Sequence, residues 1–157
     1  MFRSFIDKPH LLYKSFFIFE FMVNQKIDKD KLTKYWIEGA QDDFDTMMAM
    51  YNTNRYNWSL FIGHLMIEKL LKAYFVNTKD AYPPFIHNLL RLAEKSGIEI
   101  DDELKLDLIT ITAFNINARY DDYKMSFKNK CTPEYTSAWI KKIKKIRLWI
   151  LDMIQIQ

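Results

Sequence analysis

Few polar side chains in this 157-residue sequence are spaced so that they could do chemistry. His64, Glu68 and Lys72 follow one another at intervals of four within an apolar segment, so on a helix they share one face. Such a stripe is either the solvent-exposed side of a helix, with Glu68 and Lys72 as an ordinary ion pair, or one wall of a groove. The sequence leaves both interpretations open.

The second candidate is Arg119, in the run NARYDDY. A guanidinium group at the end of a helix can hold a phosphate group through two parallel hydrogen bonds. The alternative is a structural ion pair between Arg119 and Asp121 or Asp122. Residue chemistry alone favours the ion pair.

Other candidates for chemistry are weaker. Cys131 lies beside Lys130 and near a helix start, features that would lower the pKa of its thiol, but an unreactive thiol is the favoured interpretation. The three histidines, His10, His64 and His87, show no paired spacing, so we predict no metal site and no bound cofactor. The run WIKKIKKIRLW could contact phosphates, but its tryptophans fit an apolar seam, which favours a solvated helix face.

The composition limits the fold and the functions. With 49% hydrophobic and 27% charged residues the chain is globular, and only 3 Gly and 4 Pro argue against an all-β fold and exclude a glycine-rich phosphate loop. The net charge of +3 does not by itself indicate nucleic-acid binding. A single cysteine favours a reducing cytoplasm, and no apolar run approaches the roughly 20 residues that span a membrane.

Apolar periodicity and capping residues predict an all-α fold, an antiparallel bundle of four to five helices. Helices are expected over residues 28–52, 58–77, 85–96, 102–118 and 133–154. The second is apolar nearly all round, which is typical of a central, buried helix. We predict a polar loop over 120–132, closed by Thr132 as the cap of the last helix.

The N-terminal residues are expected to be separate from this bundle. We predict an extension over residues 1–27 and a helical domain over 28–157. The Phe-rich segment 1–21 is a poor secretory signal, because Glu20 interrupts its apolar stretch and no small-residue cleavage site follows. It is either an extra helix on the domain or sequence upstream of a natural start at Met22, and the second interpretation is favoured.

Three segments in order then carry a resemblance: FIGHLMIEKLLKAYF, PPFIHNLLRLAEKSG and FNINARYDDY. Together they resemble the HEPN domain, a helical family named for its occurrence in higher eukaryotes and prokaryotes and its proposed nucleotide binding. The recurrent features are the EKLLKA segment, the His87 that stands two residues before Leu-Leu, and ARY at the end of the fourth helix. The resemblance covers about residues 31–151.

The resemblance implies a helical bundle that is usually dimeric, with two different functions in the family. Many members are metal-independent ribonucleases that carry an Arg, a polar residue and, a few residues later, a His. Here Arg119 matches the Arg and Tyr120 takes the polar position, but no His follows His87. Other members are accessory subunits of minimal nucleotidyltransferases, and ARY without the later His resembles that branch better.

The expectation is therefore a homodimeric, non-catalytic module that binds a nucleotide or RNA and assists a minimal nucleotidyltransferase in a toxin–antitoxin-like system. The expected nucleotide groove consists of Arg119, Tyr120, His87, Lys72 and His64. Lys72, His87 and Arg119 near one cleft would repel one another unless an anion lies between them, and the resemblance suggests a nucleotide phosphate. The alternatives are a ribonuclease toxin with a displaced catalytic base and a protein-interaction module without a ligand.

Overall fold

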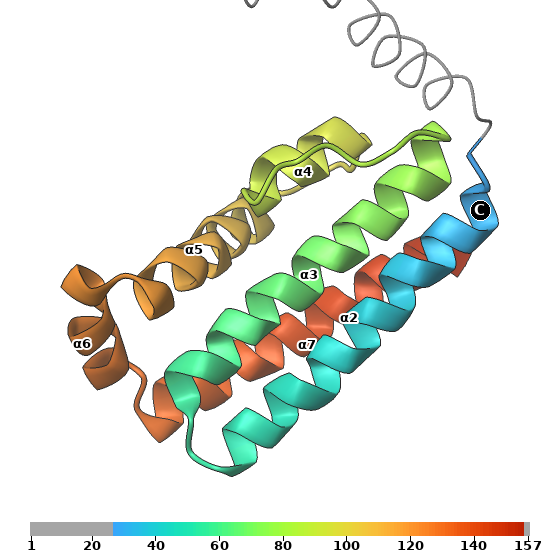
Figure 1. Ribbon diagram of the computed structural model, residues 1–157. Helices are drawn as coiled ribbons and strands as arrows, with labels where there is room; N and C mark the ends of the chain where they lie inside the picture. The colour runs from blue at the N-terminus through green and yellow to red at the C-terminus, as the bar shows by residue number, and fades with distance from the viewer. Residues whose placement is uncertain (1–26, 156–157) are drawn as a thin grey trace, which may run out of the picture.

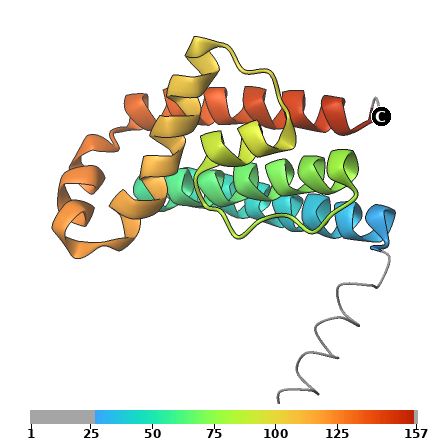
Figure 2. The same cartoon turned by 90° about the horizontal axis from the view of Figure 1, so that it is seen from above.

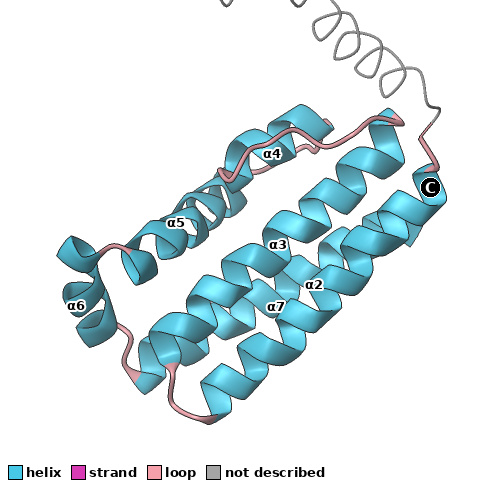
Figure 3. Cartoon of the chain, in the orientation of Figure 1, coloured by secondary structure: helices cyan, strands magenta, loops and turns pink. Residues whose placement is uncertain are grey.

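The computed structural model describes residues 27–155, apart from the side chains of 121–124, and these residues form six helices (Figure 1). They are α2 (Lys29–Asn52), α3 (Tyr56–Lys79), α4 (Leu89–Ser96), α5 (Asp102–Arg119), α6 (Asp121–Lys130) and α7 (Pro133–Gln155). The predicted all-α bundle is confirmed, since the described residues contain no strand (Figure 3). The predicted extension 1–27 and the candidate His10 lie almost wholly outside the described residues.

Helix α3 is the centre of the bundle and contacts each of the other five helices. Its long neighbours α2, α5 and α7 surround it, and α2, α3, α5 and α7 alternate in direction along the chain (Figures 1 and 2). The predicted central helix is confirmed, because fourteen of the residues of α3 are buried. Polar side chains on this helix are therefore held away from water unless they reach its edge.

Gly63 allows α2 and α7 to approach α3 closely. A Cβ atom at this position would lie 2.9 Å from Ile143 Cδ1 on α7 and 3.1 Å from Met47 Sδ on α2. Both neighbouring side chains are fully buried. The absent side chain thus lets two helices pack against α3 at the same level.

Helix ends mostly follow the predicted signals. Asp28 Oδ1 accepts a hydrogen bond from Lys31 N at 3.0 Å, and Thr132 Oγ1 accepts one from Tyr135 N at 3.2 Å, so both are N-caps. Gly97 ends α4 with a φ of 79°, a left-handed conformation that suits glycine.

The predicted start of the third helix at Phe85 is wrong. After the prolines, Ile86 N donates to Pro84 O in a turn, Phe85 is fully exposed, and α4 begins only at Leu89. Asn88 caps this start, since its Oδ1 accepts from Arg91 N at 2.9 Å. Because α4 begins only at Leu89, His87 lies in the loop that precedes the helix.

The predicted polar loop over 120–132 is also wrong, because residues 121–130 form α6. Phe127 in this helix is 4% exposed and stacks on Phe114 of α5 with a centroid distance of 5.5 Å. Cys131, directly after the helix, is buried as well. Burial of Phe127 and Cys131 therefore stabilises a helix whose other described side chains are mostly polar.

We predict that Gly63→Ala destabilises the protein. The added methyl group overlaps Ile143 and Met47, at a cost of about 1–3 kcal/mol that outweighs the helix propensity gained from replacing glycine. Gly39→Ala is the matched control, because its Cβ would meet only the flexible Lys69 side chain, whose nearest atom, Cδ, is at an ordinary 3.4 Å. Denaturant unfolding should place Gly63→Ala below the parent and Gly39→Ala at or above it. Equal midpoints for the two variants would contradict the packing described.

Candidate functional site

The centre of the candidate site is the carboxylate of Glu68 on α3, of which only 7% is exposed. Lys72 Nζ donates to Glu68 Oε1 at 2.7 Å, and His64 Nε2 lies 3.3 Å from Oε2. His87, from the loop before α4, places Nδ1 3.2 Å from Oε1 and 3.1 Å from Oε2. Three side chains from two parts of the chain therefore surround one carboxylate.

These contacts determine the charge state of Glu68. Burial would raise the pKa of Glu68, but hydrogen bonds from His64, Lys72 and His87, together with the charge of Lys72, outweigh burial and lower that pKa to about 2. The carboxylate is therefore ionised at neutral pH. It balances the charge of Lys72 and accepts a hydrogen bond from His87.

This arrangement corrects one expectation. Lys72 and His87 do not need an external anion between them, because Glu68 occupies that position. Their convergence is thus not by itself a sign of a phosphate ligand. His64 is completely buried, whereas the side chain of His87 is 73% exposed, so only His87 of the two histidines can reach a ligand.

A second group of side chains joins this cluster to the end of α5. Asn115 Nδ2 lies 3.0 Å from His64 Nε2, and Arg119 Nε donates to the backbone oxygen of Asn115 at 3.0 Å. Asn115 is one helical turn before Arg119, and that spacing is the sequence signal by which it could have been found. His64 Nδ1 and Asn115 Oδ1 are buried and have no hydrogen-bond partner among the described residues.

The Arg119 guanidinium group lies between two aromatic rings. Its Cζ atom is 5.6 Å from the ring centre of Phe61 and 5.8 Å from that of Tyr120, and Tyr120 is 57% exposed. No carboxylate among the described side chains forms an ion pair with Arg119. The suggested partners Asp121 and Asp122 lie outside the described side chains.

The five predicted site residues therefore fall into two places. His64, Lys72 and His87 gather around Glu68, and Arg119 with Tyr120 lies at the end of α5 beside Phe61. Since Phe61 and Glu68 are seven residues apart on α3, the two places are separated by about 10 Å along the helix.

The comparison with family models decides the classification. A model described as HEPN domain matches residues 33–154. The chain belongs to the HEPN domain family. No curated protein and no solved structure matches the chain.

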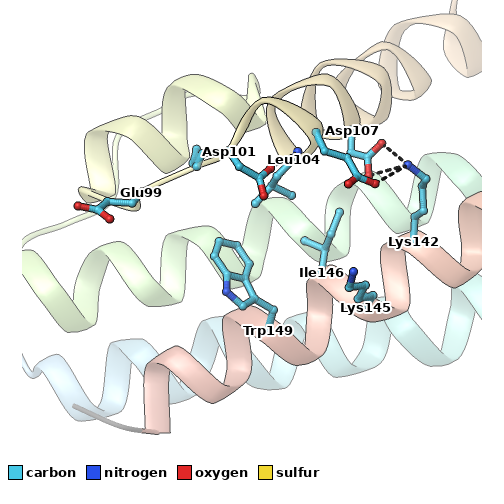
Figure 4. Close-up of a pocket in the computed structure, with 10 residues that line it drawn as sticks. Glu99, Asp101, Leu104, Asp107, Lys142, Lys145, Ile146 and Trp149 are labelled. Atoms are coloured by element: carbon cyan, nitrogen blue, oxygen red, sulfur yellow. Dashed lines mark hydrogen bonds and ion pairs between the residues drawn. The ribbon is translucent and has the colours of Figure 1, made fainter.

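This HEPN domain also contains a cleft of about 600 Å³ between the start of α5 and α7 (Figure 4). Lys142 Nζ lies 2.7 Å from Asp107 Oδ1 across it, and this bond raises the pKa of Lys142. The remaining charged lining includes three more carboxylates, those of Glu99, Asp101 and Glu103. So many acids disfavour a phosphate ligand in this cleft.

Burial decides between the interpretations of two weaker candidates, Cys131 and the last helix. Cys131 is 5% exposed, and burial raises the pKa of its thiol to about 12, the opposite of the shift expected from its basic neighbour. The expected seam of the last helix is packed, with Ile143, Ile146 and Ile150 buried. Among the side chains that the structure describes, those of residues 27–120 and 125–155, no group of three or more His, Cys, Asp and Glu is placed to hold a metal ion. No helix in that range is long and apolar enough to cross a membrane.

We predict that Glu68 contributes stability that depends on pH. Its pKa is about 2 in the folded protein and near 4.5 when unfolded, so the contribution is complete above pH 4.5 and is lost as the pH falls towards 2. The shift corresponds to about 3 kcal/mol. Glu68→Gln should remove most of this amount at pH 7 and flatten the acid limb of the stability curve.

The control for this prediction is Glu103→Gln, because the Glu103 side chain is 82% exposed. Urea unfolding at several pH values between 7 and 2 measures both variants. A Glu68→Gln variant with the parent's acid limb would refute the assignment of this stability to Glu68.

Proposed function

We propose that this HEPN domain binds a phosphate group of a nucleotide or nucleic acid at the end of α5, as a non-catalytic accessory module. The observation that supports this most strongly is the state of Arg119. Its Nε is held by the Asn115 carbonyl, and no described carboxylate pairs with the rest of the group. A guanidinium oriented in this way can offer its terminal N–H groups to a phosphate.

The aromatic neighbours favour a ligand that carries a base. Phe61 and Tyr120 flank the guanidinium, and Tyr120 has more than half of its surface exposed. An exposed tyrosine ring beside a phosphate-binding cation can stack on a nucleobase. His87 is the other exposed group of the expected groove, and it is oriented by Glu68, which is seven residues after Phe61 on α3.

The partner follows from the family branch that the sequence resembles. In that branch HEPN domains assist minimal nucleotidyltransferases, and ARY without the later His, as in this sequence, resembles that branch better than the ribonucleases. We propose the same partnership here, in a cytoplasmic toxin–antitoxin-like system. Co-purification with a candidate minimal nucleotidyltransferase is the direct test of the partnership.

The ribonuclease alternative rests on one observation. Glu68 holds His87 Nδ1, which leaves Nε2 of an exposed imidazole available as a base. Against it, His87 contacts Glu68 and Arg119 lies beside Phe61, positions about 10 Å apart along α3, and no interaction joins His87 to Arg119 within the described part of the chain. RNA cleavage by the purified protein that disappears in both His87→Ala and Arg119→Ala would establish this alternative instead.

We predict that Arg119→Ala weakens binding of ATP and of a short single-stranded RNA at least tenfold, since a charge-assisted contact contributes about 1.5–3 kcal/mol. Its melting temperature should stay near that of the parent. Arg147→Ala is the matched control, because Arg147 also lies over an aromatic ring, that of Phe44 at 4.5 Å, on another face. Calorimetry measures both ligands.

Two results would contradict the proposed function. One is equal affinity in the Arg119→Ala and Arg147→Ala variants. The other is no binding of any nucleoside triphosphate or RNA by the parent, alone and with the nucleotidyltransferase, which would leave the ligand-free interaction module as the better description.

We also propose that the protein is a homodimer through α5. Leu106, Ile109 and Ile116 on this helix are 66%, 50% and 48% exposed. Their spacing of three to seven residues makes one apolar face that no described helix covers. An exposed apolar face of this kind is typical of an interface between subunits.

We predict that Ile116→Glu converts the dimer to a monomer, because the interface would have to bury an unpaired carboxylate. Leu148→Glu is the control, since Leu148 is similarly exposed, at 56%, on α7. Light scattering at high micromolar concentration separates the two states. A monomeric parent, or a dimer that survives Ile116→Glu and not Leu148→Glu, would contradict the α5 interface.

A further inference from the structure

A second polar cavity, of about 390 Å³, lies where the turn between α2 and α3 meets α6. It is outside the predicted site, and none of its residues belongs to the expected nucleotide groove. Its lining consists of Thr53, Asn54, Arg55, Asn57, Trp58 and Lys128.

The charge of this cavity is entirely positive. Arg55 and Lys128 contribute a guanidinium and an ammonium group, and the lining includes no acid. Within the described part of the chain, neither cation forms an ion pair. Two like charges facing one small cavity repel each other unless an anion enters between them.

The start of α3 adds to the positive potential. Arg55 is the N-cap residue of this 24-residue helix, and its side chain makes no capping hydrogen bond. The first backbone N–H groups of an uncapped helix start, with the positive end of the helix dipole, favour an anion.

The third observation is the side chain of Asn57. It is only 7% exposed, it lines the cavity, and no hydrogen bond joins its amide to any described residue. The amide is not among the fully buried polar atoms without a partner, so it opens to the cavity, where a ligand can bond to it. Its N–H₂ group is a further donor for an oxyanion.

The cavity is connected to the Arg119 face by aromatic rings. Trp58 of the lining contacts Phe61 edge-to-face at 5.9 Å, and Phe61 lies 5.6 Å from the Arg119 guanidinium. Two adjoining rings, those of Trp58 and Phe61, therefore lie between the cations of the cavity and the cation at the end of α5, an arrangement that suits bases flanked by phosphates.

We propose that this cavity binds a backbone phosphate of a single-stranded nucleic acid whose next phosphates continue towards Arg119. The inference rests on the proposed function for the class of ligand, and it extends that ligand from one nucleotide to a strand. Arg55 and Lys128 contact the phosphate, and Trp58 and Phe61 lie against bases.

The test compares the double variant Arg55→Gln/Lys128→Gln with the control Arg91→Gln/Lys95→Gln, which removes two cations from α4. The probes are an eight-nucleotide single-stranded RNA and ATP. Fluorescence anisotropy over a salt series gives the affinity and its salt dependence, and thermal melting checks the fold.

The Arg55→Gln/Lys128→Gln variant should bind the RNA at least tenfold more weakly, with a salt slope shallower by about 1.4, because two cations no longer displace counterions. Its ATP affinity should match the parent, since Arg119 is intact. Equal losses for ATP and RNA would overturn the strand path and indicate one mononucleotide site. Unchanged RNA binding would overturn the cavity's role, while a loss of ATP binding in Arg119→Ala would still support the proposed function.

Discussion

The arrangement of this bundle depends on the burial of one carboxylate, that of Glu68, on the central helix. An ionised group in such a place is tolerated only when donors surround it. Lys72 and His64 on α3 and His87 before α4 supply them, so the loop leading into α4 is fixed on α3. Through His64 the same cluster reaches Asn115 on α5, and Lys72 lies 5.0 Å from the ring centre of Trp36 on α2. The buried contact of His64 with Asn115, and the contact of Asn115 with Arg119, thus position the end of α5.

Apolar periodicity was sufficient to predict the long helices, because each buries one stripe against α3. It missed α6, where Phe127 is the only large side chain described as buried, and a single anchor in a polar run has no period to detect. It also started α4 too early. Proline is common at the first position of a helix, but here the prolines stand in a segment without regular structure, and Asn88 caps α4.

The site was only partly predictable for a related reason. Spacing placed His64, Glu68 and Lys72 on one face, but the role of Glu68 depends on His87, which arrives from another element. The sequence suggested an external anion between Lys72 and His87, whereas the carboxylate of Glu68 occupies that position. Asn57 and Lys128 lie 71 residues apart and share a cavity only because α6 folds against the start of α3. No local pattern carries that information.

The proposed path of the nucleic acid runs along the first turns of α3 and the end of α5. A titration of the isotopically labelled protein with the eight-nucleotide RNA, followed by the side-chain N–H signals of arginine and tryptophan, tests it most directly. The account predicts that Arg119, Arg55 and the indole of Trp58 shift together, while the indole of Trp149 in the acidic cleft stays in place. Shifts confined to Trp149, or no shifts at saturating RNA, would contradict it.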